Sequence, residues 1–115
     1  MDNPEIDEFG TKRWYAAEGN LHRVGGPAIE WSNGTKEWRQ HGLLHRVGGP
    51  AVEWIVGDKL WYQHGKRHRD DGPAVIHVNG TSSWYLDNIS LSFDKWLDKV
   101  NLSGEEKVMM KLKYG

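Results

Sequence analysis

The sequence predicts a mainly β fold: a single-layer antiparallel sheet of tandem 23-residue β-hairpin repeats, closed by a short C-terminal helical cap. Two observations carry this prediction. Several residue columns recur every 23 residues, and the apolar periodicity changes from strand-like to helix-like after Ser92. A 23-residue unit is too short for a helix pair, and Gly interrupts each unit twice, which fits two strands and two turns.

The repeat is defined by four residue columns. The His, Arg and Pro columns have an interval of 23 (for example 45 − 22 = 23), and the Trp column has intervals of 24, 23 and 23. These columns are His22, His45 and His68; Arg23, Arg46 and Arg69; Pro27, Pro50 and Pro73; and Trp14, Trp38, Trp61 and Trp84. The array therefore extends over residues 10–91, as about 3.5 repeats, and the pattern decays after Asn88.

The composition of each unit predicts where its strands and turns lie. Asn33-Gly34 and Asn79-Gly80 are strong tight-turn dipeptides at matching places. In the run 51–54, Ala-Val-Glu-Trp, alternation places Val and Trp on one face and Ala and Glu on the other. We expect the Trp14 column to form the core, since a single sheet needs bulk. The alternative is an exposed stacking platform for bases or sugars.

After the array, apolar residues follow a helical period. Phe93, Trp96, Leu97 and Val100 fall at i, i+3, i+4 and i+7, with Ser92 as the N-cap. Residues 103–106, Ser-Gly-Glu-Glu, have capping-box spacing, and Val108, Met109 and Leu112 give a second helix an apolar stripe. We expect residues 92–115 to cap the last unit. A partner-binding amphipathic helix is the alternative.

Composition limits the class of protein. The 15 Lys and Arg residues nearly balance 16 Asp and Glu, so no nucleic acid partner is expected. The chain has no Cys, no apolar signal region at its start and no apolar run of the roughly 18 residues that a membrane span needs. We expect a cytoplasmic protein that does not enter a membrane. Residues 1–9 carry four acidic side chains and are expected to be a flexible arm.

The run 65–68, Gly-Lys-Arg-His, together with the 23-residue period, the aromatic residue ahead of Gly and the second Gly at 72, resembles membrane occupation and recognition nexus repeats. The resemblance covers Gly10 to about Leu91. The chain departs from that family at His-Arg-x-x-Gly-Pro-Ala, a variant similar to phage-encoded and antitoxin-like repeat proteins. The resemblance implies a meandering antiparallel sheet and a scaffold or interaction role, without a catalytic site.

The candidate binding residues are His22, His45, His68, Arg23, Arg46, Arg69 and Arg67. Equivalent residues of successive hairpins lie two strands, or about 10 Å, apart, so the three His cannot share one metal ion. The pairs His41/His45 and His64/His68 flank a turn and could meet, but no third metal ligand is apparent, and we predict no metal site and no cofactor. We expect each column His to donate a ring N–H to a turn carbonyl.

The Arg column has two open interpretations. A guanidinium can stack on a neighbouring Trp or Tyr while its donors satisfy turn carbonyls. The same column can form an anion-binding strip for an acidic protein or a nucleotide phosphate. No Ser or Thr recurs in phase with a His or a carboxylate, so we expect no enzyme.

The function expected from the sequence is a non-enzymatic module that binds another protein, as a small phage or mobile-element inhibitor of a host or defence protein. A small-ligand binder that holds a nucleotide or phosphate at the His and Arg columns is the second hypothesis. The third is a structural subunit that forms a homo-oligomer through its sheet edges.

Overall fold

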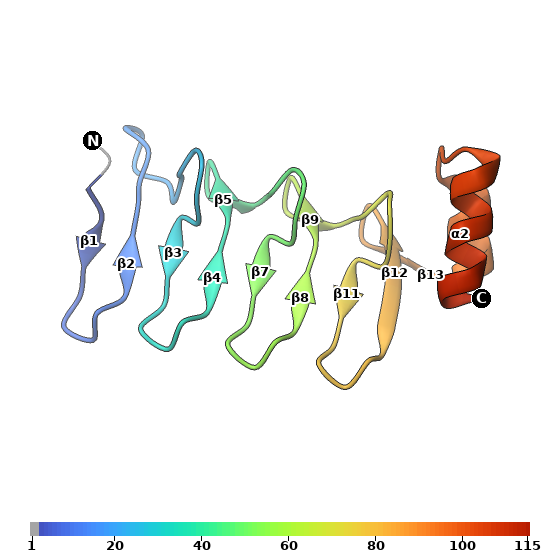
Figure 1. The fold of residues 1–115 in the computed structure, drawn as a ribbon. Helices are drawn as coiled ribbons and strands as arrows, with labels where there is room; N and C mark the ends of the chain where they lie inside the picture. The colour runs from blue at the N-terminus through green and yellow to red at the C-terminus, as the bar shows by residue number, and fades with distance from the viewer. Residues whose placement is uncertain (1–2) are drawn as a thin grey trace.

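The computed structural model describes residues 3–115 as a flat, meandering antiparallel sheet with two helices at its C-terminal end (Figure 1). The molecule measures 48 × 29 × 22 Å. The strand order of the nine-stranded sheet is β1 (Glu5–Ile6), β2 (Lys12–Arg13), β3 (Ile29–Glu30), β4 (Lys36–Glu37), β7 (Val52–Glu53), β8 (Lys59–Leu60), β11 (Val75–Ile76), β12 (Ser82–Leu86) and β13 (Ile89–Leu91). The mainly β fold with a helical cap is therefore confirmed.

The second and third units each contain one hairpin more than the sequence predicts. A second, two-stranded ladder joins β5 (Arg39–Gln40) to β6 (Leu43–Leu44), and its counterpart joins β9 (Tyr62–Gln63) to β10 (Lys66–Arg67). Its turn is His-Gly, where His41 and Gly42 have φ of 51° and 85°. A two-residue hairpin turn of this kind needs positive φ at both positions, which Gly adopts freely and His adopts more readily than most residues. These small hairpins lie along one edge of the sheet (Figure 1).

The sheet begins inside the segment expected to be a flexible arm, which corrects that boundary. Glu5–Ile6 pair with β2, and the Asp7 carboxylate accepts the backbone N–H groups of Phe9 and Thr11. Asp7 also forms an ion pair with Arg13 at 3.0 Å. Part of the acidic segment thus shapes the first turn; residues 1 and 2 lie outside the described residues.

One face of the sheet alternates Trp with Ala. Trp14 donates its backbone N–H to Ala28 and Trp38 donates to Ala51, so large and small side chains interleave from strand to strand. The Ala column at 28, 51 and 74 is fully buried. Trp14 and Trp84 are buried, as expected for a core, whereas the two middle members of the Trp column are half-buried.

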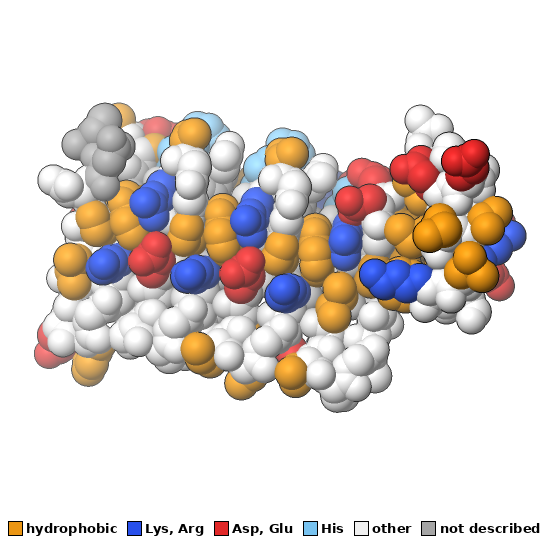
Figure 2. Space-filling model, in the orientation of Figure 1, with side chains coloured by type: hydrophobic (Ala, Val, Ile, Leu, Met, Phe, Trp, Pro, Cys, Tyr) orange, Lys and Arg blue, Asp and Glu red, His pale blue; other side chains and the backbone are white. Residues whose placement is uncertain are grey.

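On the same face, a row of alternating charge crosses the sheet. Register places Lys12, Glu30, Lys36, Glu53 and Lys59 in successive strands, each opposite the next. Figure 2 shows blue and red side chains alternating along this face. Opposite charges on neighbouring strands each contribute a few tenths of a kcal/mol and disfavour register slips.

The opposite face carries the second Trp column with the buried β-branched residues. Ile29, Val52 and Val75 are buried, and Trp31 and Trp54 follow two positions after the first two of them. Both of these Trp rings are substantially exposed, at 37% and 48%. The Trp31 ring donates its Nε1–H to the Glu37 carboxylate at 2.8 Å, which holds it against the sheet.

The helices α1 (Phe93–Lys99) and α2 (Gly104–Tyr114) cover the last hairpin, as predicted for a cap. Ser92 is the N-cap of α1, and Ser103 with Glu106 forms the predicted capping box of α2. The core of the cap consists of Trp84, Trp96, Leu97 and Val100, with Met110 and Tyr114 packed against it.

The apolar stripe predicted for α2 does not face the core. Val108, Met109 and Leu112 are 56%, 65% and 78% exposed, and Met110 and Tyr114 make the contacts instead. The spacing correctly predicted a helix, but the prediction of which side of α2 packs was wrong, because Met110 and Tyr114 contact the core.

Candidate functional site

The predicted His and Arg columns lie together along one edge of the Trp-Ala face. We call His22, Arg23, His45, Arg46, His68 and Arg69 the His-Arg strip. Each pair follows the small hairpin or turn of its unit and precedes the loop that leads to the Pro column. Blue side chains recur between orange ones at regular intervals along this edge in Figure 2.

Each Arg of the strip stacks on the Trp of its own unit. The Cζ atoms of Arg23, Arg46 and Arg69 lie 3.8, 3.8 and 3.9 Å from the Trp ring centroids. A Cβ built on Gly49 would lie 2.8 Å from the Arg46 Cζ, so backbone covers the other side of the guanidinium. The Arg46 Nη1 also donates to the Pro50 carbonyl at 3.0 Å. Each guanidinium is thus sandwiched between a ring and a glycine.

The Nη1 atoms of Arg23 and Arg46 each form an ion pair with a Glu carboxylate that was not among the predicted binding residues. Arg23 pairs with Glu30 at 3.5 Å and Arg46 with Glu53 at 3.2 Å. These Glu residues share the spacing of the repeat, seven positions after each Arg, which is the signal that could have identified them. At the matching position of unit three stands Ile76.

The His column has the opposite polarity to the one predicted. The Nδ1 atom of His22 accepts the backbone N–H of His41, and the Nδ1 of His45 accepts that of His64, both at 3.0 Å. His68 accepts the N–H of Asp87 in the same way at 3.1 Å. An imidazole that accepts at Nδ1 carries its proton on Nε2. Each column His therefore links its unit to the turn of the following unit.

The His rings pair between successive units. The rings of His22 and His41 lie 4.6 Å apart and those of His45 and His64 lie 4.5 Å apart. Burial, followed by the neighbouring His64, lowers the pKa of His45 below its ordinary value. Among residues 3–115, no group of three His, Asp or Glu side chains is arranged to hold a metal ion.

Recesses of similar composition lie along the strip, one in each of the first three units. The first is lined by Trp14, His22 and Arg23; the second by Trp38, His45 and Arg46; and the third by Trp61, His68 and Arg69. Gln40 and Gln63 occupy matching places in the second and third, and the preceding Gly-Gly loop closes one side of each.

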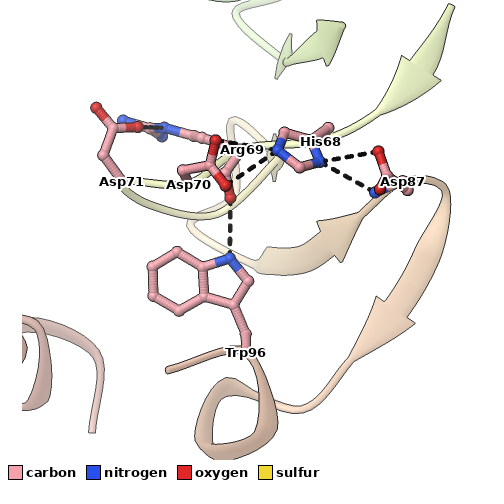
Figure 3. A network of polar contacts seen from close by, with 6 residues as sticks. All are labelled: His68, Arg69, Asp70, Asp71, Asp87 and Trp96. Carbon is pink, nitrogen blue, oxygen red and sulfur yellow. Dashed lines mark hydrogen bonds and ion pairs between the residues drawn. The ribbon is translucent and has the colours of Figure 1, made fainter. Parts of the chain in front are cut away.

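The third recess differs because two carboxylates of the chain itself line it and pair with its Arg and His. Asp70 and Asp71 stand where the other units have Val-Gly. The Asp71 carboxylate accepts from the Arg69 Nε at 2.8 Å, and Asp70 lies 3.0 Å from the His68 Nε2 (Figure 3). The Trp96 Nε1–H donates to the Arg69 carbonyl at 2.9 Å, which connects the cap to this network.

The remaining predicted residue, Arg67, belongs to a different environment. Its Nε donates to the Tyr62 hydroxyl at 3.1 Å and its Nη1 to the Tyr85 hydroxyl at 3.4 Å. The hydrogen bond to Tyr62, the largest influence, raises the Arg67 pKa. Arg67 therefore bridges the hydroxyl groups of Tyr62 and Tyr85 and lies outside the His-Arg strip.

The fold and the strip define a β-hairpin repeat protein with a helical cap. Comparison of the chain with protein-family models, curated proteins and solved structures gives no match. No helix within residues 3–115 is long and apolar enough to cross a membrane.

Proposed function

We propose that this chain is a non-enzymatic repeat module that binds another protein through the His-Arg strip. The observation that carries the proposal is the recurrence of one kind of recess in three successive units, each with a Trp, a His and an Arg on its wall. Trp and Arg are the residue types that dominate binding energy at protein interfaces.

The shape and the margins of the strip favour a protein partner over a small ligand. Repeat arrays present extended surfaces, whereas small-ligand sites are enclosed cavities. Val24 and Val47 stand beside the first two Arg residues and are 79% and 81% exposed, which gives the first two recesses an apolar margin. A phosphate ligand alone would make no apolar contacts with these two Val side chains. The family resemblance extends the proposal to the role of a small phage or mobile-element inhibitor.

Site-specific photocrosslinking in the cells that carry the protein tests this proposal. A benzophenone amino acid at Val24 or Val47 lies on the strip, and the same amino acid at Val78, which is 69% exposed, is the matched control at the Asn79-Gly80 turn. We expect a discrete crosslinked protein from the two strip positions only. Crosslinks from Val78 alone, or from no position, would contradict the proposal.

A further inference from the structure

The third recess indicates what the first two are built to bind. It has the same Trp, His and Arg walls, but its two ligand-facing donors are already satisfied by Asp70 and Asp71. In the other units Val-Gly stands at those positions, so no side-chain carboxylate of that loop can reach the donors.

The donors that Asp70 and Asp71 pair with in unit three are left open in the first two units. The Nη1 of Arg23 and Arg46 is engaged by Pro and Glu oxygens, but within residues 3–115 the Nε of neither Arg has a hydrogen-bond partner. The Nε2 of His22 and His45 also has none there, and it carries the ring proton because Nδ1 accepts. Within the described part of the chain, each open recess thus leaves unpaired the Arg Nε and His Nε2 donors that are paired in unit three.

Exposure agrees with this difference between the units. The side chains of Arg23 and Arg46 are 32% and 29% exposed, against 19% for Arg69, which Asp71 partly covers. Since a Trp ring and a glycine cover both faces of each guanidinium, a ligand can reach it at the edges, which include Nε.

We infer that the recesses at Arg23 and Arg46 each bind one side-chain carboxylate of an acidic, extended protein segment, at the Arg Nε–H that Asp71 occupies in unit three. This inference rests on the proposed function, whose protein partner it specifies. Carboxylates are the chemistry that the chain itself places on these donors, and Arg Nε–H with a carboxylate makes a charge-assisted hydrogen bond.

The geometry of the array also sets the spacing of the two carboxylates. Equivalent atoms of successive units are two strands apart, which is about 10 Å. In a polyproline II segment, residues i and i+3 point to the same side about 9.3 Å apart. A partner segment of the form Asp-x-x-Asp in that conformation therefore matches Arg23 and Arg46 at once.

The test is an NMR titration that monitors the three Arg Nε–H signals of the full chain. The probe is a peptide that contains Asp-Pro-Pro-Asp, and the matched control contains Asp-Pro-Asp-Pro, which has the same composition and charge with different spacing. We expect the Arg23 and Arg46 signals to shift with the first peptide and the Arg69 signal to stay, with affinity at least twofold above that for the control peptide.

A gain of binding provides a second, independent variant. Asp70→Val together with Asp71→Gly gives unit three the loop sequence of the other units. A peptide with three Asp residues at this spacing should then shift the Arg69 signal, with affinity raised about two- to fivefold by one added exposed ion pair. Glu8→Gln with Glu105→Gln makes the same charge change at the two ends of the chain and should leave Arg69 unresponsive.

Several outcomes would overturn the inference. They are equal shifts at all three Arg in the wild type, equal affinity for both peptides, or an unresponsive Arg69 in the folded double variant. Saturation of Arg23 and Arg46 by inorganic phosphate, without competition by the acidic peptide, would assign the recesses to a phosphate ligand instead. If the double variant does not fold, the wild-type titration decides alone. Strip-specific photocrosslinks combined with a failed titration would leave the proposed function standing and remove only its acidic partner.

Discussion

The Arg46 guanidinium lies 3.8 Å from the centroid of the Trp38 ring, and the only backbone that fits against its other side is that of a glycine. A Cβ on Gly49 would come within 2.8 Å of the Arg46 Cζ. Gly49 has no positive φ; the left-handed residue of this loop is Gly48, with φ of 86°. The constraint at Gly49 is therefore the close approach of the Arg46 side chain.

Gly49→Val should lower the free energy of unfolding by about 1–3 kcal/mol. The side chain displaces the guanidinium from Trp38, with the loss of a cation–π contact worth about 0.5–2 kcal/mol and of its hydrogen bond to Pro50. Urea unfolding measures the change. Gly104→Ala is the control, since a Cβ there meets nothing within 4 Å. Equal midpoints for Gly49→Val and the wild type would show that the sandwich contributes nothing.

The polarity of the His column predicts how stability responds to pH. The folded state needs the His45 Nδ1 unprotonated to accept the His64 N–H, and burial lowers the pKa of His45 from its ordinary 6.5. The unfolded chain therefore binds more protons just below that value. This contribution to stability is complete above about pH 6.5 and is lost as pH falls through the lower folded pKa.

Unfolding free energies measured from pH 7.5 to 5 check this expectation. His45→Asn keeps an acceptor oxygen near the place of Nδ1 but does not titrate, so it should retain most of the stability at pH 7.5 and fall less steeply than the wild type. His45→Ala lacks the acceptor at every pH and should cost about 1 kcal/mol at pH 7.5. An identical pH slope for the wild type and the Asn variant would contradict this assignment.

Local patterns predicted the alternation of side chains along residues 51–54 and both helix starts, because each depends on residues close in sequence. Ser92 and Ser103 cap their helices as expected, and the Arg column stacks on Trp. The polarity of His22 could not be predicted, since its partner is the backbone of a turn 19 residues later. The small hairpins of the second and third units were missed because His41 and His64 adopt a left-handed turn conformation that is more common for Asn or Gly.

The contact between Trp96 and Arg69 predicts that the cap and the third unit unfold together. Trp96 is fully buried against Trp84, with ring centroids 4.5 Å apart, and its Nε1–H donates to the Arg69 carbonyl. Trp96→Ala should destabilise the chain by about 3–5 kcal/mol. Trp96→Phe keeps an aromatic ring but loses the donor, so its cost should be smaller.

Circular dichroism at 222 nm and the Arg69 Nε–H signal, followed in the same denaturant series, measure this coupling. We expect both to change at one midpoint in the wild type. In Trp96→Ala the helical signal should be lost at lower denaturant. Loss of the helices with no change at Arg69 would show that the cap does not support the third unit.

The last prediction orders the three Arg of the strip by their contribution to stability. Arg23 has the longest contacts, 3.3 Å to the Pro27 carbonyl and 3.5 Å to Glu30, whereas Arg46 makes the matching contacts at 3.0 and 3.2 Å. Arg69 also bonds to Asp71 and is the least exposed of the three. The loss of stability should therefore rise from Arg23→Gln through Arg46→Gln to Arg69→Gln.

Binding should follow a different order from stability. Arg69 already holds a carboxylate, so Arg69→Gln should change affinity for an acidic partner least. Arg23→Gln should keep near-wild-type stability, within about 1 kcal/mol, yet lose affinity. That loss should shrink as salt rises, because exposed charges are screened over about 8–10 Å at physiological ionic strength.

Thermal unfolding and affinity for the Asp-Pro-Pro-Asp peptide at two salt concentrations, measured on each variant, separate the order of stability from the order of affinity. If the variant that loses most stability also loses most affinity, the His-Arg strip affects binding only because it stabilises the fold. If all three variants bind with normal affinity, the partner is recognised elsewhere on the sheet.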